Sequence, residues 1–127
     1  MATTYLNSIG EIMIVYEENF FVDEDIKIEF AGFLTGYLEK ITKHKGFQYA
    51  AWFFPSDKVE SGKVCWTIHF SIDGLDSLKD YLNNAASQNQ GELKAKFNDK
   101  FSLNTRTLNL LGIYGLPENL NSLMENK

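Results

Sequence analysis

The sequence predicts an α+β domain of the ferredoxin-like plan, βαββαβ, in which two helices cover one face of a four-stranded antiparallel sheet. Three observations lead to this prediction. Residues 63–72, KVCWTIHFSI, alternate apolar and polar side chains, as a half-buried strand does. The segments follow in the order strand, helix, strand, strand, helix, strand, in which each helix can form a right-handed crossover. The length of 127 residues suits one domain with one core.

The composition excludes several classes of protein. Hydrophobic residues make up 44% of the chain and aromatic residues 14%, which is typical of a globular domain rather than a disordered one. The formal net charge is -5 and the basic residues are scattered, so we expect no nucleic-acid partner. The single cysteine, Cys65, allows neither an internal disulfide nor a multi-cysteine metal site. No signal-peptide pattern or membrane-spanning run occurs, which predicts a cytoplasmic protein with no membrane partner.

The first strand is predicted over residues 9–21. Apolar residues occur there at both odd and even positions, so both faces of the strand are apolar, which indicates an inner strand covered on both sides. After this strand, Asp23 is the expected N-cap of a helix that continues to about His44. The helix would bury one apolar stripe, formed by Ile26, Phe30, Phe33, Leu34, Tyr37 and Ile41.

Glycines mark two features of this predicted helix. Gly32 and Gly36 lie within it, where each costs about 1 kcal/mol relative to alanine. Their four-residue spacing on one face suggests a close approach of the helix to the sheet. Gly46 follows three basic residues and is expected to end the helix as its C-cap.

The second strand, over residues 47–54, has aromatic and apolar side chains on both faces. Pro55 ends it, and a polar connection leads to residues 63–72, which predicts a hairpin. A strand that is apolar on both faces needs two covers. Because the helices supply only one, we expect the open face of the sheet to pair with a second copy of the chain as a homodimer.

The second half of the chain contains a further helix and strand. Residues 75–97 carry a helical apolar stripe, with Asp73 or Asp76 as the expected N-cap and a kink or break in the weak segment 86–91. Residues 101–114 are rich in β-forming residues and predict the fourth strand.

The whole chain, residues 1–127, is expected to be a single domain, because it shows no repeat, low-complexity tract or second hydrophobic core. An N-terminal arm is predicted over residues 1–8 and the ferredoxin-like core over 9–115. A C-terminal amphipathic tail follows over 116–127, with Pro117 at a helix-start position.

The segment from Asp80 to Leu111 resembles the C-terminal half of a small bacterial family of domains of unknown function. The family usually has a tryptophan and a histidine-isoleucine-proline turn in the region of residues 9–45, and neither is present here, so no role of those residues is carried over. The resemblance implies the dimeric α/β-barrel group, whose members pair sheet to sheet and include cofactor-independent monooxygenases, dehydratases and binding proteins. The residues that carry the likeness are Tyr81, Lys96, Phe97, Phe101, Arg106 and Thr107.

His69 is the first candidate for a ligand-binding residue, because the alternation of residues 63–72 places it, together with Thr67, on the polar face of its strand. A histidine there can donate or accept a proton in a cavity beside the sheet. The alternative, which we favour, is a hydrogen-bonded interface histidine. Cys65 cannot form a nucleophile and base pair with His69, because four strand residues separate the two by roughly 13 Å.

Arg106 and Tyr49 complete the predicted ligand site. Arg106 lies in a strand rich in leucine and threonine, where it can bind a ligand carboxylate or phosphate or form an ion pair with an acidic residue of the chain. Tyr49 belongs to an aromatic group that can line an apolar pocket for a flat ligand or can pack in the core and the dimer interface. The other members of that group are Trp52, Phe53, Phe54 and Trp66.

The other polar residues that could suggest a catalytic or metal-binding site have simpler explanations. His44, between two lysines at a helix end, is expected to be solvated rather than catalytic. The acidic residues from Glu17 to Asp25 lack the spacing of a calcium loop and are better explained by helix capping. No nucleotide-binding, nucleophile-elbow or zinc motif occurs, so we predict no cofactor and no metal.

The sequence favours a homodimeric, non-enzymatic module that binds a ligand or another protein, because no convergent set of acid, base and nucleophile can be identified. A small hydrophobic ligand is the expected partner besides the second copy of the chain. The alternative is a cofactor-independent oxygenase or isomerase of the dimeric α/β-barrel type, in which His69 and Arg106 orient or protonate a flat hydrophobic substrate. The sequence specifies neither the ligand nor which strand-four residues share a face with His69.

Overall fold

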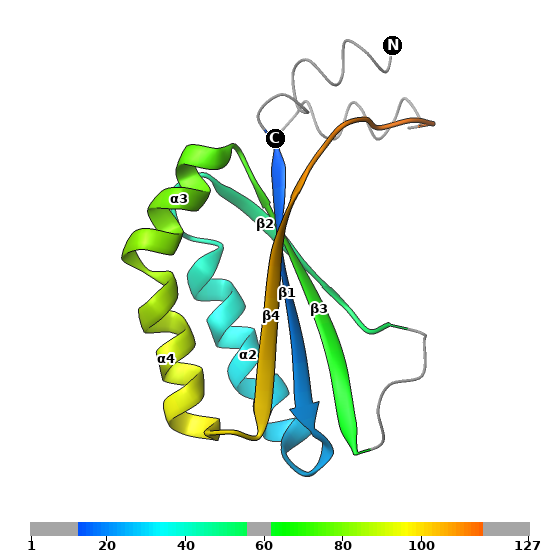
Figure 1. Cartoon of the computed structure of the whole chain (residues 1–127), viewed down its shortest axis with the longest axis vertical. Helices are drawn as coiled ribbons and strands as arrows, with labels where there is room; N and C mark the ends of the chain where they lie inside the picture. The colour runs from blue at the N-terminus through cyan, green and yellow to red at the C-terminus, as the bar shows by residue number, and fades with distance from the viewer. Residues whose placement is uncertain (1–12, 56–61, 116–127) are drawn as a thin grey trace.

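The computed structural model describes residues 13–55 and 62–115, which form a layer of strands and a layer of helices (Figure 1). The predicted arm over residues 1–8 and tail over 116–127 lie outside the described residues. The elements follow in the order β1 (Ile14–Asp23), the 3-10 helix η2 (Glu24–Ile26), α2 (Lys27–Ile41), β2 (Phe47–Phe53), β3 (Lys63–Ile72), α3 (Leu75–Asn84), α4 (Ala86–Phe97) and β4 (Phe101–Asn109).

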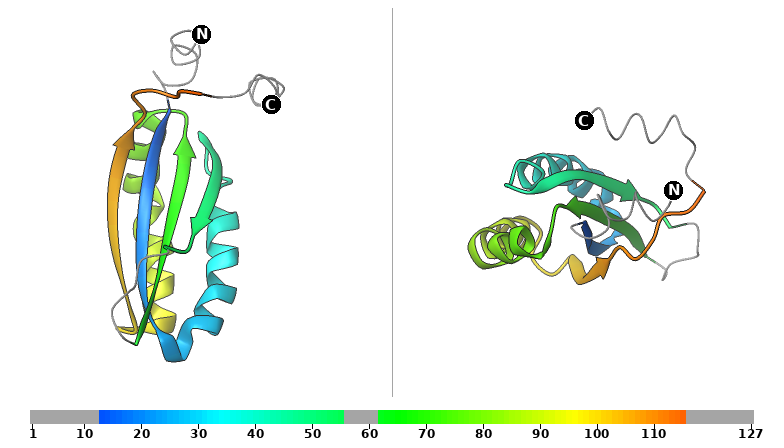
Figure 2. Two further views of the ribbon diagram at one scale, coloured as in Figure 1. Left: turned by 90° about the vertical axis from the view of Figure 1, so that its right-hand side faces the viewer. Right: turned by 90° about the horizontal axis from the view of Figure 1, so that it is seen from above.

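The four strands form one antiparallel sheet in the order β2-β3-β1-β4. The predicted ferredoxin-like plan is therefore confirmed, with the second helical segment divided in two to give βαββααβ. The left view of Figure 2 looks onto the sheet from the side that carries no helix, because α2, α3 and α4 all lie behind the strands. We call this helix-free side the open face. None of the helices in the described ranges is both long and apolar enough to cross a lipid bilayer.

The core lies between the sheet and the helices. The alternation predicted over residues 63–72 is confirmed, because Ile68, Phe70 and Ile72 are completely buried on the helix side of β3. On β1, Tyr16 lies opposite Phe70 and Phe20 lies opposite Trp66 on the same side of the sheet. Edge-to-face aromatic pairs join these two β1 residues to the helices. The helices contribute large core residues of their own, which are Phe30, Leu34, Tyr37, Ile41, Leu78, Tyr81, Leu93 and Phe97.

The ends of the first helical segment differ from the prediction. The side chain of Asp23 makes no capping hydrogen bond and instead accepts one from Nζ of Lys63, at 2.8 Å. The α-helix ends at Ile41 rather than near His44, because the chain enters a turn. Gly46 is not the C-cap; it lies in that turn with φ of 87° and its carbonyl accepts the amide of Asp73.

Gly32 and Gly36 do not mediate a close approach to the sheet, and that expectation was wrong. A Cβ atom built on either glycine meets no atom within 4 Å, and both residues are exposed on the outer side of α2. Buried aromatic and branched side chains on the opposite side of the helix set its distance from the sheet instead.

The second helical segment breaks at Ala85, just before the predicted weak segment 86–91, which is itself helical. Ala85 leaves helical geometry with φ of -133°. Gly74 is the N-cap of α3, and Asp73 does not cap it but accepts a hydrogen bond from Oγ of Ser77 at 2.6 Å. The fourth strand ends at Asn109 and not at residue 114.

Candidate functional site

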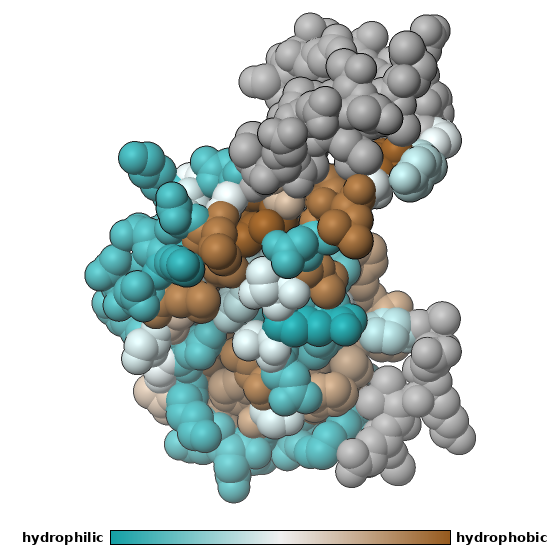
Figure 3. Space-filling model, turned by 45° about the horizontal axis from the view of Figure 1, so that its top comes forward, coloured by the Kyte–Doolittle hydropathy of each residue, from teal (hydrophilic) through white to brown (hydrophobic). Residues whose placement is uncertain are grey.

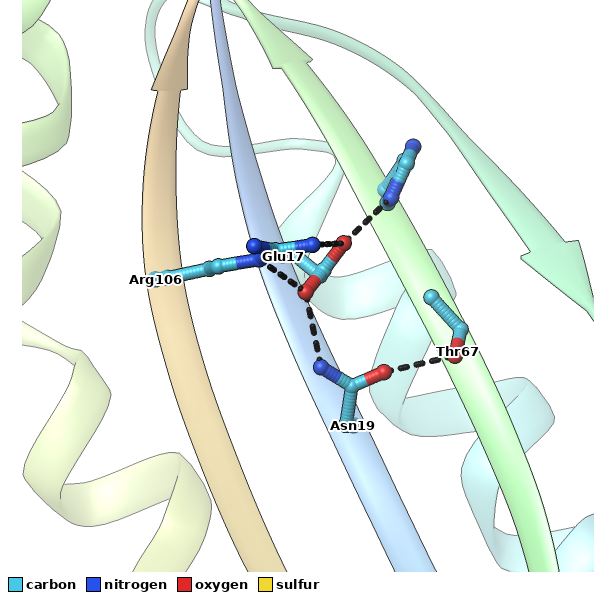
Figure 4. Close-up of polar contacts among 5 residues, drawn as sticks. Glu17, Asn19, Thr67 and Arg106 are labelled. Atoms are coloured by element: carbon cyan, nitrogen blue, oxygen red, sulfur yellow. Dashed lines mark hydrogen bonds and ion pairs between the residues drawn. The ribbon is translucent and has the colours of Figure 1, made fainter.

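Three residues on three neighbouring strands form a polar row across the open face. Glu17 in β1 pairs directly with His69 in β3 and with Arg106 in β4. The carboxylate accepts a hydrogen bond from Nε2 of His69 at 2.8 Å on Oε1 and one from Nε of Arg106 at 2.6 Å on Oε2. Nη2 of Arg106 lies 3.5 Å from Oε1, so the guanidinium faces both oxygens (Figure 4). The two sequence candidates are thus held by a shared carboxylate.

Asn19 extends this network along β1 and links it to Thr67. The side-chain amide of Asn19 donates to Oε2 of Glu17 at 2.8 Å, and its oxygen accepts from Oγ1 of Thr67 at 2.6 Å. Asn19 and Thr67 are also paired residues of β1 and β3 (Figure 4). We refer to Glu17, Asn19, Thr67, His69 and Arg106 as the open-face network.

The network stabilises the negative charge of Glu17. The side chain of Glu17 is only 6% exposed, which by itself would raise the pKa of its carboxyl group. The hydrogen bond from Arg106 outweighs burial, and those from Asn19 and His69 add to it, so the pKa of Glu17 is lowered to about 2. The same contact raises the pKa of Arg106. Glu17 is therefore ionised at every pH at which the protein would normally be handled.

Tyr49 lies on the same face but outside the network. It pairs with Ser71 in β3, and its side chain is largely exposed. The aromatic residue that meets the network is Phe53, whose ring centroid lies 5.1 Å from that of His69. The structure thus brings together three of the four residues predicted to bind a ligand, and leaves Tyr49 at the side of the group.

Glu18 lies on the opposite face of the sheet from Glu17 and is completely buried in the core. The hydroxyl of Tyr37 donates to its carboxylate, at 2.9 and 3.1 Å from the two oxygens, and Nε2 of Gln90 lies 3.4 Å from one of them. Burial raises the pKa of Glu18 to about 7, against the opposing effect of these hydrogen bonds. This second polar group joins β1, α2 and α4.

Sequence reasoning missed both glutamates, which it assigned to helix capping. The sequence did contain a signal for the burial of Glu18. This residue alternates along the strand with Tyr16, Phe20 and Val22, so it shares their face of the sheet, and all three are buried. Glu17 lies on the other face of the strand, where the sequence shows no continuous row of apolar residues. Its pairing with Arg106 depends on the register of β1 against β4, which could not be read from either strand alone.

The chemistry that the open-face network can perform is limited by its internal contacts. His69 directs Nε2 and Arg106 directs Nε and Nη2 at Glu17, so these donors already have an acceptor within the chain. Cys65 is a free thiol on the same face, and burial raises its pKa, which disfavours a reactive thiolate. No group of three or more histidine, cysteine or acidic side chains within residues 13–55 and 62–115 is arranged to hold a metal ion.

Comparison with known families gives a match over most of the chain. The family described as "Domain of unknown function (DUF4286)" matches residues 13–111, which include every strand and helix described above. A search of curated protein sequences finds no match to this chain.

Solved structures with the same fold include several proteins of the dimeric α/β-barrel group. A conserved protein of unknown function from Bacteroides thetaiotaomicron, described as a possible oxidoreductase, is 13% identical, with a TM-score of 0.59 over 80% of this chain and 98% of that one. A variant of SnoaB, a cofactor-independent oxygenase from Streptomyces nogalater, is 14% identical, with a TM-score of 0.59 over 82% and 97%. An ethyl tert-butyl ether D family protein from Bacillus halodurans is 14% identical, with a TM-score of 0.54 over 75% and 97%. At these identities the likeness establishes the fold alone.

Proposed function

The chain belongs to the family described as a domain of unknown function (DUF4286), and we propose that it is a homodimeric binding module whose subunits pair through their open faces. The observation that carries the proposal is the composition of the open face. Aromatic and apolar side chains flank a polar network in which the charges of Glu17 and Arg106 are paired with each other, so a second sheet can cover the face without leaving either charge unpaired.

The apolar part of the open face lies on both sides of the network. Tyr49 and Phe53 in β2 are 54% and 46% exposed. At the β1–β4 side, Val15 and Leu108 are directly paired and only partly buried. Aromatic and aliphatic side chains left exposed on a sheet face are typical of a surface that another protein covers. Figure 3, in which the top of the molecule comes forward, shows hydrophobic residues near the top of the described surface and along its right side, and hydrophilic residues over much of the helical layer at the left.

The charges of the open face favour a partner of the same kind. Glu17 is paired with Arg106, and Asp23 with Lys63 at 2.8 Å, so these two ion pairs add no net charge to the face. The whole chain carries a formal charge of -5, and two copies would repel each other over most of their surfaces. The open face is a region where they can approach without that repulsion.

A catalytic role receives less support. The oxygenase or isomerase alternative needs His69 and Arg106 to contact a substrate, whereas Nε2 of His69 and Nε of Arg106 contact Glu17. SnoaB and similar neighbours favour that alternative only through a fold that supports many functions. We therefore infer that the open-face network pairs the charges of the proposed dimer interface and fixes its side chains in place, and that it does not catalyse a reaction.

Matched variants test the interface by sedimentation equilibrium. Phe53→Asp places a charge on the open face, and Ile28→Asp places the same charge at a residue that is 82% exposed on α2. We expect the unmodified chain and Ile28→Asp to be dimers at micromolar concentration and Phe53→Asp to be a monomer. Equal association of the two variants would show that the subunits do not pair through the open face, and a monomeric unmodified chain would refute the homodimer itself.

A further inference from the structure

Glu18 is a buried acid that has no positive charge beside it. Its carboxylate accepts hydrogen bonds from Tyr37 of α2 and, at a longer distance, from Gln90 of α4, and the hydroxyl of Tyr16 on β1 lies near it. The residues paired with it in β3 and β4 are an isoleucine and a threonine, which do not titrate. None of the ion pairs in the described part of the chain includes Glu18. Loss of its proton therefore leaves a charge in the core that only neutral donors stabilise.

Tyr81 on α3 adds a second buried polar group next to Glu18. Within residues 13–55 and 62–115, its hydroxyl has no hydrogen-bond partner. Burial raises the pKa of Tyr81 to about 12, the nearby side chain of Asn89 on α4 opposes this effect, and the negative charge of Glu18 adds to it. Native proteins seldom leave a buried hydroxyl unpaired, so contact with water would stabilise this one.

The segment that covers these two groups is weakly held as a helix. We call residues 85–91 the junction segment, because it contains the break at Ala85, where φ is -133°, and the first half of α4. No side chain caps α4 at its start, and the segment ends at Gly91, a residue type that disfavours helix. The second half of α4 is anchored by Leu93 and Phe97, which are 0% and 4% exposed.

A pocket of about 300 Å³ lies against the junction segment. Ala85 and Asn89 of the segment line it, together with Tyr81. The same segment contacts Glu18 through Gln90. It therefore stands between the pocket and the buried carboxylate, and an outward movement of the segment would connect the two.

The end of α2 forms another wall of the pocket and is more firmly held. Nε2 of His44 lies 2.9 Å from Oδ2 of Asp80, and the ring packs edge-to-face against those of Phe47 and Tyr81. The side chain of His44 is only 21% exposed, so the expectation that it is solvated was wrong. Of these two walls, the junction segment is the one that can move.

We propose that loss of the proton from Glu18 opens the junction segment, so that water from the pocket reaches Glu18 and Tyr81. The segment pivots at Ala85 and Gly91, while the second half of α4 stays on the sheet. Glu18 and Tyr81 lie on the helix side of the sheet, so the opening does not depend on dimerisation through the open face.

The pH range of the opening follows from the two states of Glu18. Burial raises the pKa of the closed state to about 7, and the solvated carboxyl of the open state returns toward the ordinary value of 4.5. The open state therefore binds protons less tightly, and its share of the population grows as the pH rises between these values. The equilibrium constant for opening should increase about tenfold per pH unit and level off above about pH 7.

Amide hydrogen exchange measured by NMR between about pH 5 and 8 tests the proposal. The reporters are the amides of Asn89, which donates to the carbonyl of Ala85 at 3.0 Å, and of Gln90. Their protection factors, which correct for the pH dependence of chemical exchange, should fall about tenfold per pH unit up to about pH 7.

Low concentrations of urea distinguish local opening from unfolding of the whole chain. The two reporter amides should be less protected than those of β1 and β3, and urea should change their protection little, because a local opening exposes little surface. Equal protection of both groups, with the same dependence on urea, would show that the junction segment opens only when the chain unfolds, and would overturn the proposal.

The acid itself is tested by a matched pair of variants. Glu18→Gln keeps the size of the side chain and removes the titration, so protection in the junction segment should no longer depend on pH. Glu92→Gln changes an exposed acid on the same helix and should leave the pH dependence as it is. A pH dependence that persists in Glu18→Gln would contradict the proposal.

A second pair of variants tests the pivot. Gly91→Ala adds a Cβ atom that meets no other atom within 4 Å, so it should stabilise the helix and raise the protection of Asn89 about two- to fivefold at every pH. Gly32→Ala is equally free of contacts but lies in α2, and it should leave Asn89 unchanged. Equal effects of the two variants on Asn89 would mean that the segment does not open independently of the rest of the fold.

Discussion

Glu17 and Arg106 are directly paired residues of neighbouring strands, and Nε of Arg106 lies 2.6 Å from Oε2 of Glu17. This contact is the largest cause of the low pKa of Glu17. It joins the central strand β1 to the edge strand β4 on the face that we propose as the dimer interface. The contact has consequences that can be measured in solution.

Removing the guanidinium should raise the pKa of Glu17. In the unmodified chain this pKa is about 2, and Arg106→Gln should move it toward the ordinary value of 4.5, as measured by NMR titration of the carboxyl carbon. Ser102→Ala, on the same face of β4, is the control and should leave it unchanged. Because the pKa is lowered by folding, Glu17 contributes stability above about pH 4.5 that is lost as the pH falls toward 2. Arg106→Gln should weaken this acid dependence; a pKa that stays near 2 would exclude Arg106 as its cause.

Glu18 should affect stability in the opposite sense. Its pKa is raised by folding from 4.5 to about 7, so the folded chain takes up a proton between these values and loses stability as the pH rises through them. A shift of that size means that the ionised Glu18 lowers the free energy of unfolding by roughly 3 kcal/mol relative to the protonated form. Glu18→Gln should therefore unfold at higher urea than the unmodified chain at pH 8, and at a similar concentration at pH 4.

An exposed glutamate provides the control for this effect. Glu92 on α4 is about half exposed and pairs with Lys40 at the surface, so Glu92→Gln should change the urea midpoint little at either pH. If Glu18→Gln were less stable than the unmodified chain at pH 8, the ionised carboxylate would have to be favourable in the core, contrary to the burial argument.

Gly46 should be far less tolerant of alanine than Gly32. Gly46 has φ of 87°, and an added Cβ atom would collide with the side chain of Ser77. Gly46→Ala should therefore destabilise the fold by roughly 1–3 kcal/mol. Gly32 lies in α2 with no atom near the added Cβ, so Gly32→Ala should stabilise by roughly 0.5–1 kcal/mol. Thermal unfolding followed by circular dichroism would compare the two. Equal effects would mean that the turn can rearrange around Gly46.

The period of the apolar residues was enough to predict most of the fold. Residues 63–72 were predicted as a strand from alternation alone, and β3 has those bounds. The break between α3 and α4 was also expected within a residue or two, because the segment after it has few apolar residues. The caps were less predictable: Asp23 accepts from Lys63, 40 residues away in sequence, rather than from its own helix.

The site was harder to predict than the fold. Parity correctly put His69 and Thr67 on the polar face of β3, but it could not show that Glu17 stands between His69 and Arg106. That arrangement depends on strand register, to which residues distant in sequence contribute.

The proposed interface can be tested most directly with an isotope-filtered NOE experiment on a mixture of labelled and unlabelled chains. This measurement detects only protons of different subunits that lie close together. We predict signals between subunits from the methyl groups of Val15 and Leu108 on the open face, and none from those of Ile28 on the outer side of α2. Signals confined to helical residues, or no signal between subunits at a concentration where the chain associates, would contradict pairing through the open face.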